Sequence, residues 1–147
     1  MVKSKWLDKD IDDLSAVEHI YKTVFTQEQG VPEERYLNDL KTYAALLAVY
    51  IDGQTVGTGR IQIEDGKYVL KGVAILKEHR GAKLGDFIVR LLIRKAYEMG
   101  AQKQWLYAWP SVLGFYARFG FEAVGMQLQP CTGCIEMVRE GDITGNC

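Results

Sequence analysis

The sequence lacks a long apolar run, a strong net charge and an apolar leader. Its longest apolar stretch, residues 43–51, is far shorter than the roughly 20 residues that a membrane-spanning helix needs. The first residues, MVKSKWLDKDID, contain no apolar core of a signal peptide. A net charge of −1 provides no basic field that would attract nucleic acid. We therefore predict a cytoplasmic protein without a membrane or nucleic-acid partner.

Cysteine and histidine are also scarce. The three cysteines, Cys131, Cys134 and Cys147, are an odd number, which disfavours a disulfide framework. Cys131 and Cys134 have the spacing of a redox pair or of half a zinc site. A closed zinc site needs four ligands, and the two histidines, His19 and His79, are far apart in the sequence. A redox pair should open a helix after a strand, whereas this pair lies between two strand-like runs. We expect no metal, and a thiol redox or metal function remains an alternative.

The length and composition are those of one ordinary folded domain. The chain has 147 residues, of which 48% are hydrophobic and 25% charged, and it shows no repeat or linker. We therefore predict a single domain over residues 1–147. Apolar residues at helical spacing predict a first helix over Leu14–Phe25, with Asp12 or Asp13 at its start. The polar residues 26–39 predict a loop that leads into a short helix.

Three strand-like runs follow, over residues 43–51, 55–64 and 67–76. They are separated by Asp52-Gly53 and Asp65-Gly66. Asp-Gly between two such runs favours a type I′ turn, because both central positions of that turn need a positive φ. The sequence therefore predicts an antiparallel meander.

The second half alternates helices and strands. Apolar spacing predicts a helix from Gly85 that ends at Gly100, then a strand over 103–109 and a helix over 110–120. Two closing strands are predicted over 121–129 and 134–140. A strand, a helix and a further strand imply a right-handed crossover and a locally parallel pair. The predicted fold class is α/β, with a meander that feeds into a βαβ unit.

The segment between the third strand and the next helix favours an anion site. The first turn of a helix leaves backbone N–H groups unpaired and carries partial positive charge. Gly81 and Gly85 permit close backbone approach, while Arg80 and Lys83 add charge. A phosphate or pyrophosphate suits such a site, although a simple strand-to-helix turn is the alternative. The loop matches neither a P-loop nor a dinucleotide fingerprint.

The loop does resemble the acetyl-CoA loop of the GNAT superfamily of N-acetyltransferases. VAI at 73–75 precedes RGAKLG at 80–85, where Lys83 stands in place of the usual second glycine. FYARFGF at 115–121 matches a second family signature. EQGVPEE, VGTGRI and GVAILKEHRG are similar to segments of small stand-alone bacterial members. The resemblance implies a mixed, mostly antiparallel central sheet flanked by helices, with a strand-loop-helix site for acetyl-CoA.

The resemblance also implies a site and a co-substrate, acetyl-CoA. Its pantetheine arm would lie along the third strand, and its pyrophosphate would bind the amides of the loop. The implied binding residues are Val73, Ala74, Ile75, Arg80, Gly81, Ala82, Lys83, Leu84, Gly85 and Asp86.

The implied reaction transfers an acetyl group from acetyl-CoA to a primary amine by direct attack. Tyr116 matches the family tyrosine that protonates the departing thiolate. Glu28 is the predicted base, with Glu64 and an ordered water as alternatives. The acceptor is a small-molecule or peptide amine, and a homodimer is the usual assembly of this fold. Two departures from the family pattern suggest an alternative, a non-catalytic CoA-binding or regulatory module. They are Lys83 and Trp109, and Trp109 stands where relatives often carry Asn or Gln.

Overall fold

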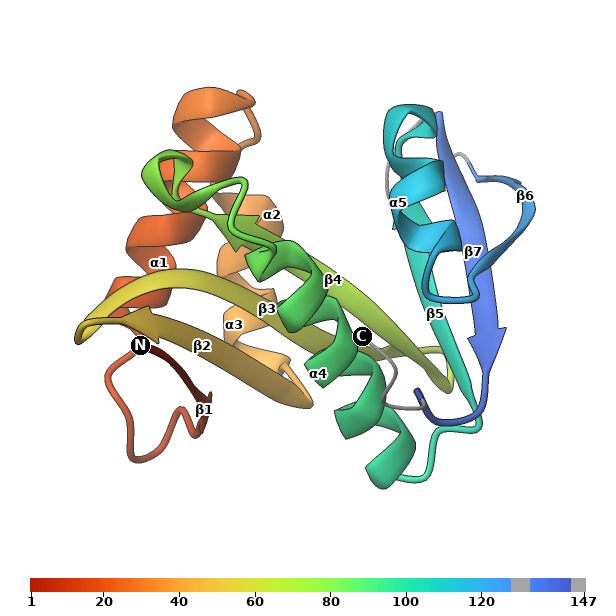
Figure 1. The fold of residues 1–147 in the computed structure, drawn as a ribbon, viewed down its shortest axis with the longest axis horizontal. Helices are drawn as coiled ribbons and strands as arrows, with labels where there is room; N and C mark the ends of the chain where they lie inside the picture. The colour runs from red at the N-terminus through yellow and green to blue at the C-terminus, as the bar shows by residue number, and fades with distance from the viewer. Residues whose placement is uncertain (128–132, 144–147) are drawn as a thin grey trace.

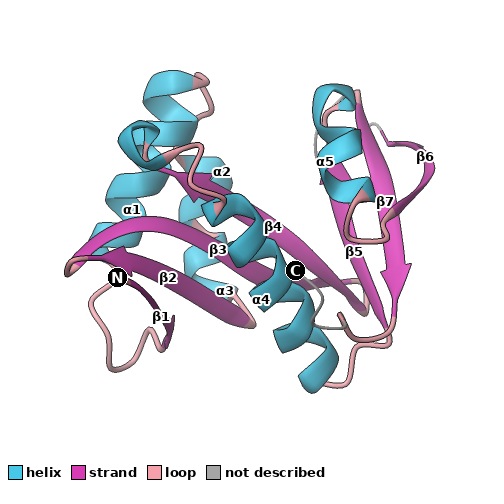
Figure 2. Ribbon diagram, viewed as in Figure 1, coloured by secondary structure: helices cyan, strands magenta, loops and turns pink. Residues whose placement is uncertain are grey.

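One seven-stranded mixed sheet forms the centre of the computed structural model, which describes residues 1–127 and 133–143 (Figures 1 and 2). The strand order is β1-β2-β3-β4-β5-β7-β6. The strands are β1 (Val2–Leu7), β2 (Ala45–Ile51), β3 (Gln54–Glu64), β4 (Lys67–Ile75), β5 (Lys103–Ala108), β6 (Glu122–Gln127) and β7 (Cys134–Glu140). Neighbouring strands pair antiparallel except β4 and β5, which pair in parallel. The predicted α/β class, with its mostly antiparallel sheet, is confirmed.

Helices cover both faces of the sheet. They are α1 (Ser15–Tyr21), the π-helix η1 (Lys22–Glu28), α2 (Glu34–Leu37), α3 (Asp39–Thr42), the 3₁₀ turn η2 (Lys77–His79), α4 (Leu84–Glu98), the 3₁₀ turn η3 (Pro110–Val112) and α5 (Leu113–Ala117). One apolar core joins α4 to the sheet, and a second joins α1, η1, α2 and α3 to the opposite face (Figure 1). Because both faces are covered, β2 and β3 are buried almost without alternation.

The predicted meander is confirmed as β2, β3 and β4. Both connecting turns have a positive φ at the two central residues: 50° and 83° at Asp52 and Gly53, and 51° and 77° at Asp65 and Gly66. This is the type I′ geometry that Asp-Gly favours, since glycine adopts positive φ without steric cost.

Several predicted elements differ from the observed ones. The first helix extends beyond Phe25 because α1 passes into the π-helix η1, which ends at Glu28. Strand β1 was not predicted; it lies at the edge of the sheet, and its residues are mostly exposed. The predicted helix over 110–120 is a 3₁₀ turn followed by one short α-helix. The strand predicted over 121–129 is observed as β6 up to Gln127, and its last two residues lie outside the described chain.

A bulge interrupts β4 near its middle. Thr58 pairs with Ala74 while Arg60 pairs with Lys71, so one residue of β3 faces two residues of β4. Gly72, inside the bulge, has a φ of +65°. A Cβ at this position would lie 2.1 Å from Nη1 of Arg60, so only glycine fits here.

Candidate active site

Strands β4 and β5 run side by side for only a short distance. Their parallel register joins Tyr68 to Gln104 and Val69 to Trp105, and the described chain shows no further pair between them. Strand β4 continues to Ile75, still paired with β3 on its other side. Figure 1 shows β4 and β5 diverging beyond this point. The backbone of residues 73–75 is therefore held by β3 on one side and has no ladder partner from β5 on the other.

The loop after β4 has left-handed backbone at two residues just before helix α4 begins. Gly81 has a φ of +90°, and Lys83 has φ +62° and ψ +22° immediately before the first residue of α4. Lys83, which stands in place of the usual second glycine, therefore has left-handed backbone. A non-glycine residue in this region costs about 1–2 kcal/mol. The first turn of α4, which begins at Leu84, follows directly.

Helix α5 packs beside the start of α4. A Cβ at Gly85 would lie 3.4 Å from Cζ of Phe115 on α5. The carboxylate of Asp86 on α4 forms an ion pair with the guanidinium of Arg118, which follows α5. Asp86 is thus paired with a cation next to the loop. These contacts bring the helix that carries Tyr116 to the predicted acetyl-CoA loop.

The ring of Tyr116 lies among aromatic side chains. The Tyr116 ring packs edge-on against Phe115, at 5.0 Å between centroids, and against Phe121, at 6.2 Å. Burial raises the pKa of the phenol. The described residues provide no hydrogen-bond partner for its oxygen. The phenol therefore stays protonated at neutral pH.

Both carboxylates proposed as the base form ion pairs. Oε1 of Glu28, the last residue of η1, lies 2.9 Å from Nη2 of Arg80, whose Nε donates to the carbonyl of Ile75. This places Glu28 beside the loop. Glu64 lies at the end of β3, where its carboxylate is 2.6 Å from Nζ of Lys71.

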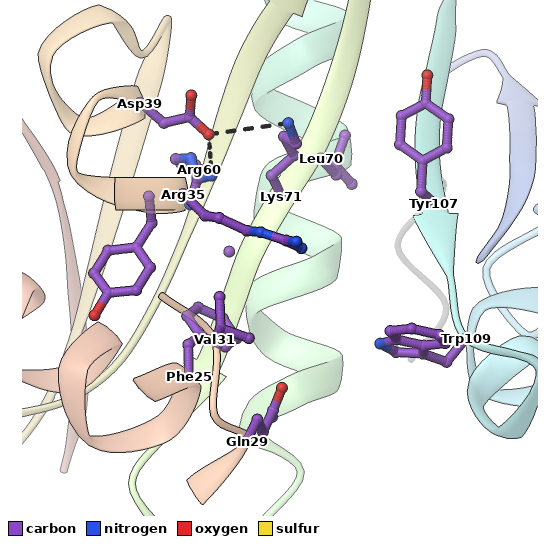
Figure 3. Close-up of a pocket in the computed structure, with 12 residues that line it drawn as sticks. Phe25, Gln29, Val31, Arg35, Asp39, Arg60, Leu70, Lys71, Tyr107 and Trp109 are labelled. Atoms are coloured by element: carbon purple, nitrogen blue, oxygen red, sulfur yellow. Dashed lines mark hydrogen bonds and ion pairs between the residues drawn. The ribbon is translucent and has the colours of Figure 1, made fainter. Parts of the chain in front are cut away.

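A pocket of about 280 Å³ opens between the diverging strands and the segment that runs from η1 to α3 (Figure 3). It is lined by Phe25, Gln29, Val31, Arg35, Tyr36, Asp39, Arg60, Leu70, Lys71, Gly72, Tyr107 and Trp109. Among these residues the sequence analysis had singled out Trp109, which is 53% exposed. The others come from separate elements, and the sequence assigned none of them a role in a pocket.

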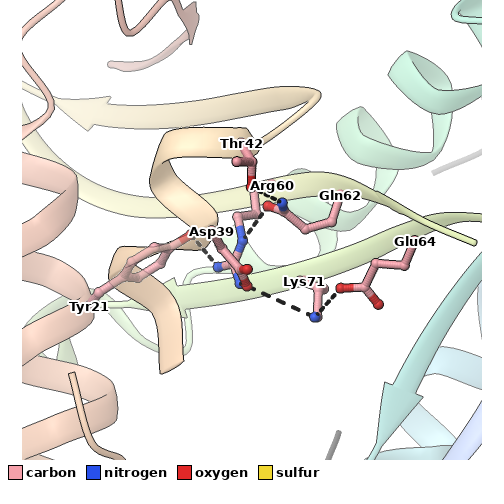
Figure 4. Close-up of polar contacts among 7 residues, drawn as sticks. All are labelled: Tyr21, Asp39, Thr42, Arg60, Gln62, Glu64 and Lys71. Carbon is pink, nitrogen blue, oxygen red and sulfur yellow. Dashed lines mark hydrogen bonds and ion pairs between the residues drawn. The ribbon is translucent and has the colours of Figure 1, made fainter. Parts of the chain in front are cut away.

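A chain of charges forms one wall of this pocket (Figure 4). Buried Arg60 donates from Nη2 to Asp39 at 2.6 Å and from Nη1 to the hydroxyl of Tyr21 at 3.0 Å. Lys71 lies 2.6 Å from Glu64 and 3.9 Å from the same Asp39 oxygen. Asp39 therefore balances Arg60, and Glu64 balances Lys71.

The cysteine predictions have mixed outcomes. Cys134 is 2% exposed and forms a disulfide, whereas the odd number of cysteines had disfavoured disulfides. Cys131 and Cys147 lie outside the described residues.

Within residues 1–127 and 133–143, no group of three potential ligands is placed to hold a metal ion. None of the helices in that part of the chain has the length and apolar character needed to cross a membrane.

Comparisons with known proteins agree with this geometry. The family described as Acetyltransferase (GNAT) family matches residues 14–121. The uncharacterized N-acetyltransferase YjcF of Bacillus subtilis (strain 168) is 30% identical over 116 residues, which cover 79% of this chain and 83% of that protein. An acyl-CoA N-acyltransferase from Pseudomonas aeruginosa has a similar fold, with a TM-score of 0.80 and 23% identity over 95% of this chain and 99% of that one. A GNAT family acetyltransferase from Brucella melitensis, solved in complex with acetyl-CoA, has a TM-score of 0.74 and 19% identity, covering 98% of this chain and 91% of that one.

Proposed function

The chain belongs to the GNAT family of acetyltransferases, and on this premise we propose that it transfers an acetyl group from acetyl-CoA to a primary amine by direct attack. The observation that carries the proposal is the divergence of β4 and β5 after two paired residues, beside a loop with left-handed backbone at Gly81 and Lys83. The pocket of about 280 Å³ opens at the same divergence. In this proposal the co-substrate binds along β4 and the loop, the acceptor binds in the pocket, and the two sites meet at β4.

The residues present fit acetyl-CoA. The edge of Val73, Ala74 and Ile75 that β5 leaves unpaired offers backbone N–H and C=O groups to the amides of a pantetheine arm, apart from the Ile75 carbonyl, which already accepts from Nε of Arg80. The amides from Arg80 to Asp86, at the start of a 15-residue helix, suit a pyrophosphate. Bound acetyl-CoA supplies a thioester carbonyl, which a neutral amine can attack.

The protein's own contribution is polarisation and proton transfer. A backbone N–H of β4 stabilises negative charge on the carbonyl oxygen. Tyr116, protonated and without a hydrogen-bond partner among the described residues, donates to the departing thiolate. We retain Glu28 as the proposed base, with Glu64 as the alternative. Each would act while paired with a cation, Glu28 with Arg80 and Glu64 with Lys71.

Ligand binding tests the first half of the proposal. Thermal unfolding is measured with acetyl-CoA, CoA, ATP and NAD, each added in large excess. A ligand at a hundred times its Kd stabilises a protein by about 2.7 kcal/mol. We expect stabilisation by acetyl-CoA and CoA and none by ATP or NAD. Equal stabilisation by all four would show a site that recognises phosphate without CoA, which would contradict the proposal.

Turnover tests the second half. With any accepted amine, Tyr116→Phe should lower kcat by about 10²- to 10⁴-fold, the usual contribution of a general acid. The phenylalanine ring preserves the packing against Phe115 and Phe121, so the midpoint of thermal unfolding should change little. Undiminished kcat in this variant would contradict the assignment of Tyr116. Glu28→Gln and Glu64→Gln, compared side by side, identify the base as the residue whose loss removes the acidic limb of the pH profile.

A further inference from the structure

The pocket holds one more cation than its carboxylates balance. Three basic side chains line it, Arg35, Arg60 and Lys71, together with one carboxylate, Asp39. Arg60 is paired with Asp39 at 2.6 Å, and Lys71 is paired at 2.6 Å with Glu64, outside the lining. In the part of the chain that the structure describes, Arg35 makes no ion pair and no side-chain hydrogen bond.

Arg35 is placed to meet a ligand. It lies on α2, one turn before Asp39, and its side chain extends across the pocket toward β4 (Figure 3). Arg35 is exposed to solvent, so its guanidinium remains hydrated when no ligand is bound. A guanidinium presents a planar pair of N–H donors, which matches the two oxygens of a carboxylate.

The rest of the lining is largely apolar and aromatic. Phe25 and Val31 stand on the side of Arg35, with Tyr107 and Trp109 across from them on and after β5 (Figure 3). A volume of about 280 Å³ is small for a ligand site. It suits a compact apolar body of the size of one amino-acid side chain.

Resting on the function proposed above, we propose that the acceptor is a small amine that also carries a carboxylate, as a free amino acid does, and that Arg35 binds this carboxylate. The unbalanced charge in the pocket is a single positive one, which one carboxylate neutralises. The apolar lining takes the body of the acceptor. A polyamine fits poorly, because Asp39, the carboxylate in the lining, is already bound to Arg60 and Lys71. Arg35 is thus a specificity-determining residue, separate from the groups that move protons.

The test uses pairs of amines that differ only in the carboxylate: phenylalanine with phenethylamine, leucine with isopentylamine, and 4-aminobutyrate with propylamine. Acetylated product is measured for the wild-type enzyme and for Arg35→Met, Arg35→Lys and Arg94→Met. Arg94 is the matched control: an exposed arginine on α4, which covers the opposite face of the sheet. Calorimetry with the CoA-saturated enzyme gives the Kd of phenylalanine and phenethylamine without any turnover.

We expect the wild-type enzyme to prefer the carboxylated member of a pair in kcat/KM by about 10- to 100-fold, as for a charge-assisted hydrogen bond. Arg35→Met should lose this preference and bind phenylalanine at least about 10-fold more weakly. Its thermal shift with CoA should be unchanged, because Arg35 lies in the pocket and not in the loop proposed for the co-substrate. Arg35→Lys should fall between the two, because lysine keeps the charge but loses the paired donors. Arg94→Met should behave as the wild type.

Two results overturn the inference while the proposed function stands: acetylation confined to carboxylate-free amines, or an equal loss on both members of a pair in Arg35→Met. A third result, no acetylation of any amine by an enzyme that acetyl-CoA does not stabilise, overturns the proposed function and the inference together. A wild-type enzyme that binds acetyl-CoA but neither binds nor acetylates the carboxylated amines overturns the inference alone.

Discussion

Replacing Lys83 by glycine should make the protein more stable and its acetyl-CoA site weaker. Lys83 has φ +62°, a conformation that destabilises the folded state by about 1–2 kcal/mol for a residue with a Cβ. Glycine adopts this φ without strain, but the greater flexibility of the unfolded chain with glycine lowers stability by about 0.5–1 kcal/mol. The free energy of unfolding should therefore rise by about 0.5–1 kcal/mol, or about 1–4 °C in Tm for a chain of this size. Because the variant also removes a cation beside the proposed pyrophosphate site, its Kd for acetyl-CoA should increase.

Gly81→Ala is the matched control in the same loop. Gly81 has φ +90°, and a Cβ there would meet nothing within 4 Å, so any loss of stability reports the backbone conformation alone. Urea unfolding should show Gly81→Ala destabilised by about 1–2 kcal/mol while Lys83→Gly is stabilised. If Lys83→Gly were destabilised as well, the lysine side chain would have to stabilise the loop by more than its backbone costs, and the reasoning from φ would be refuted.

Three other changes probe the packing and the charges. Gly72→Ala should cost about 3–5 kcal/mol in urea unfolding, because it combines a positive φ with a Cβ 2.1 Å from Nη1 of buried Arg60; a loss below about 1 kcal/mol would contradict this. Gly59→Ala places a methyl group 2.8 Å from two side chains of α4 and should cost about 1–3 kcal/mol; an unchanged Tm would show that α4 can move aside. Lys5 and a backbone amide lower the pKa of the Asp12 carboxyl below its usual 3.8, so its stabilisation is present above that pH and lost as the pH falls through the lower folded value. Asp12→Asn should flatten this acid-side loss when unfolding is followed across the same pH range, and an unaltered acid limb would contradict the assignment.

The elements with strong local signals could be predicted from the sequence. The Asp-Gly pairs at residues 52–53 and 65–66 predicted the meander, because both central residues of a type I′ turn need a positive φ. Apolar spacing located α4, and Gly100, with φ +102°, ended it as expected. The edge strand β1 had no such signal. Its residues are mostly exposed, so VKSKWL shows no alternation of buried and exposed positions, and only its pairing with β2 makes it a strand.

The pocket proposed for the acceptor could not be predicted because its lining depends on tertiary contacts. Arg35 and Trp109 lie far apart in the sequence, and they share a pocket only because β5 lies next to β4 in the sheet. Helix α1 also continues as a π-helix, which turns the residues after Tyr21 onto different faces than a 3.6-residue period predicts. The strand-loop-helix segment, by contrast, is contiguous in sequence, and it forms a strand, a loop and a helix as predicted.

The early divergence of β4 and β5 creates an edge in the interior of the sheet. A strand with unsatisfied N–H and C=O groups is a template for another extended chain, and proteins usually shield such strands. Here the unpaired edge, residues 73–75, lies at the centre of the fold, where covering it permanently would close the proposed site. A bound co-substrate would then complete the ladder and protect these amides from hydrogen exchange.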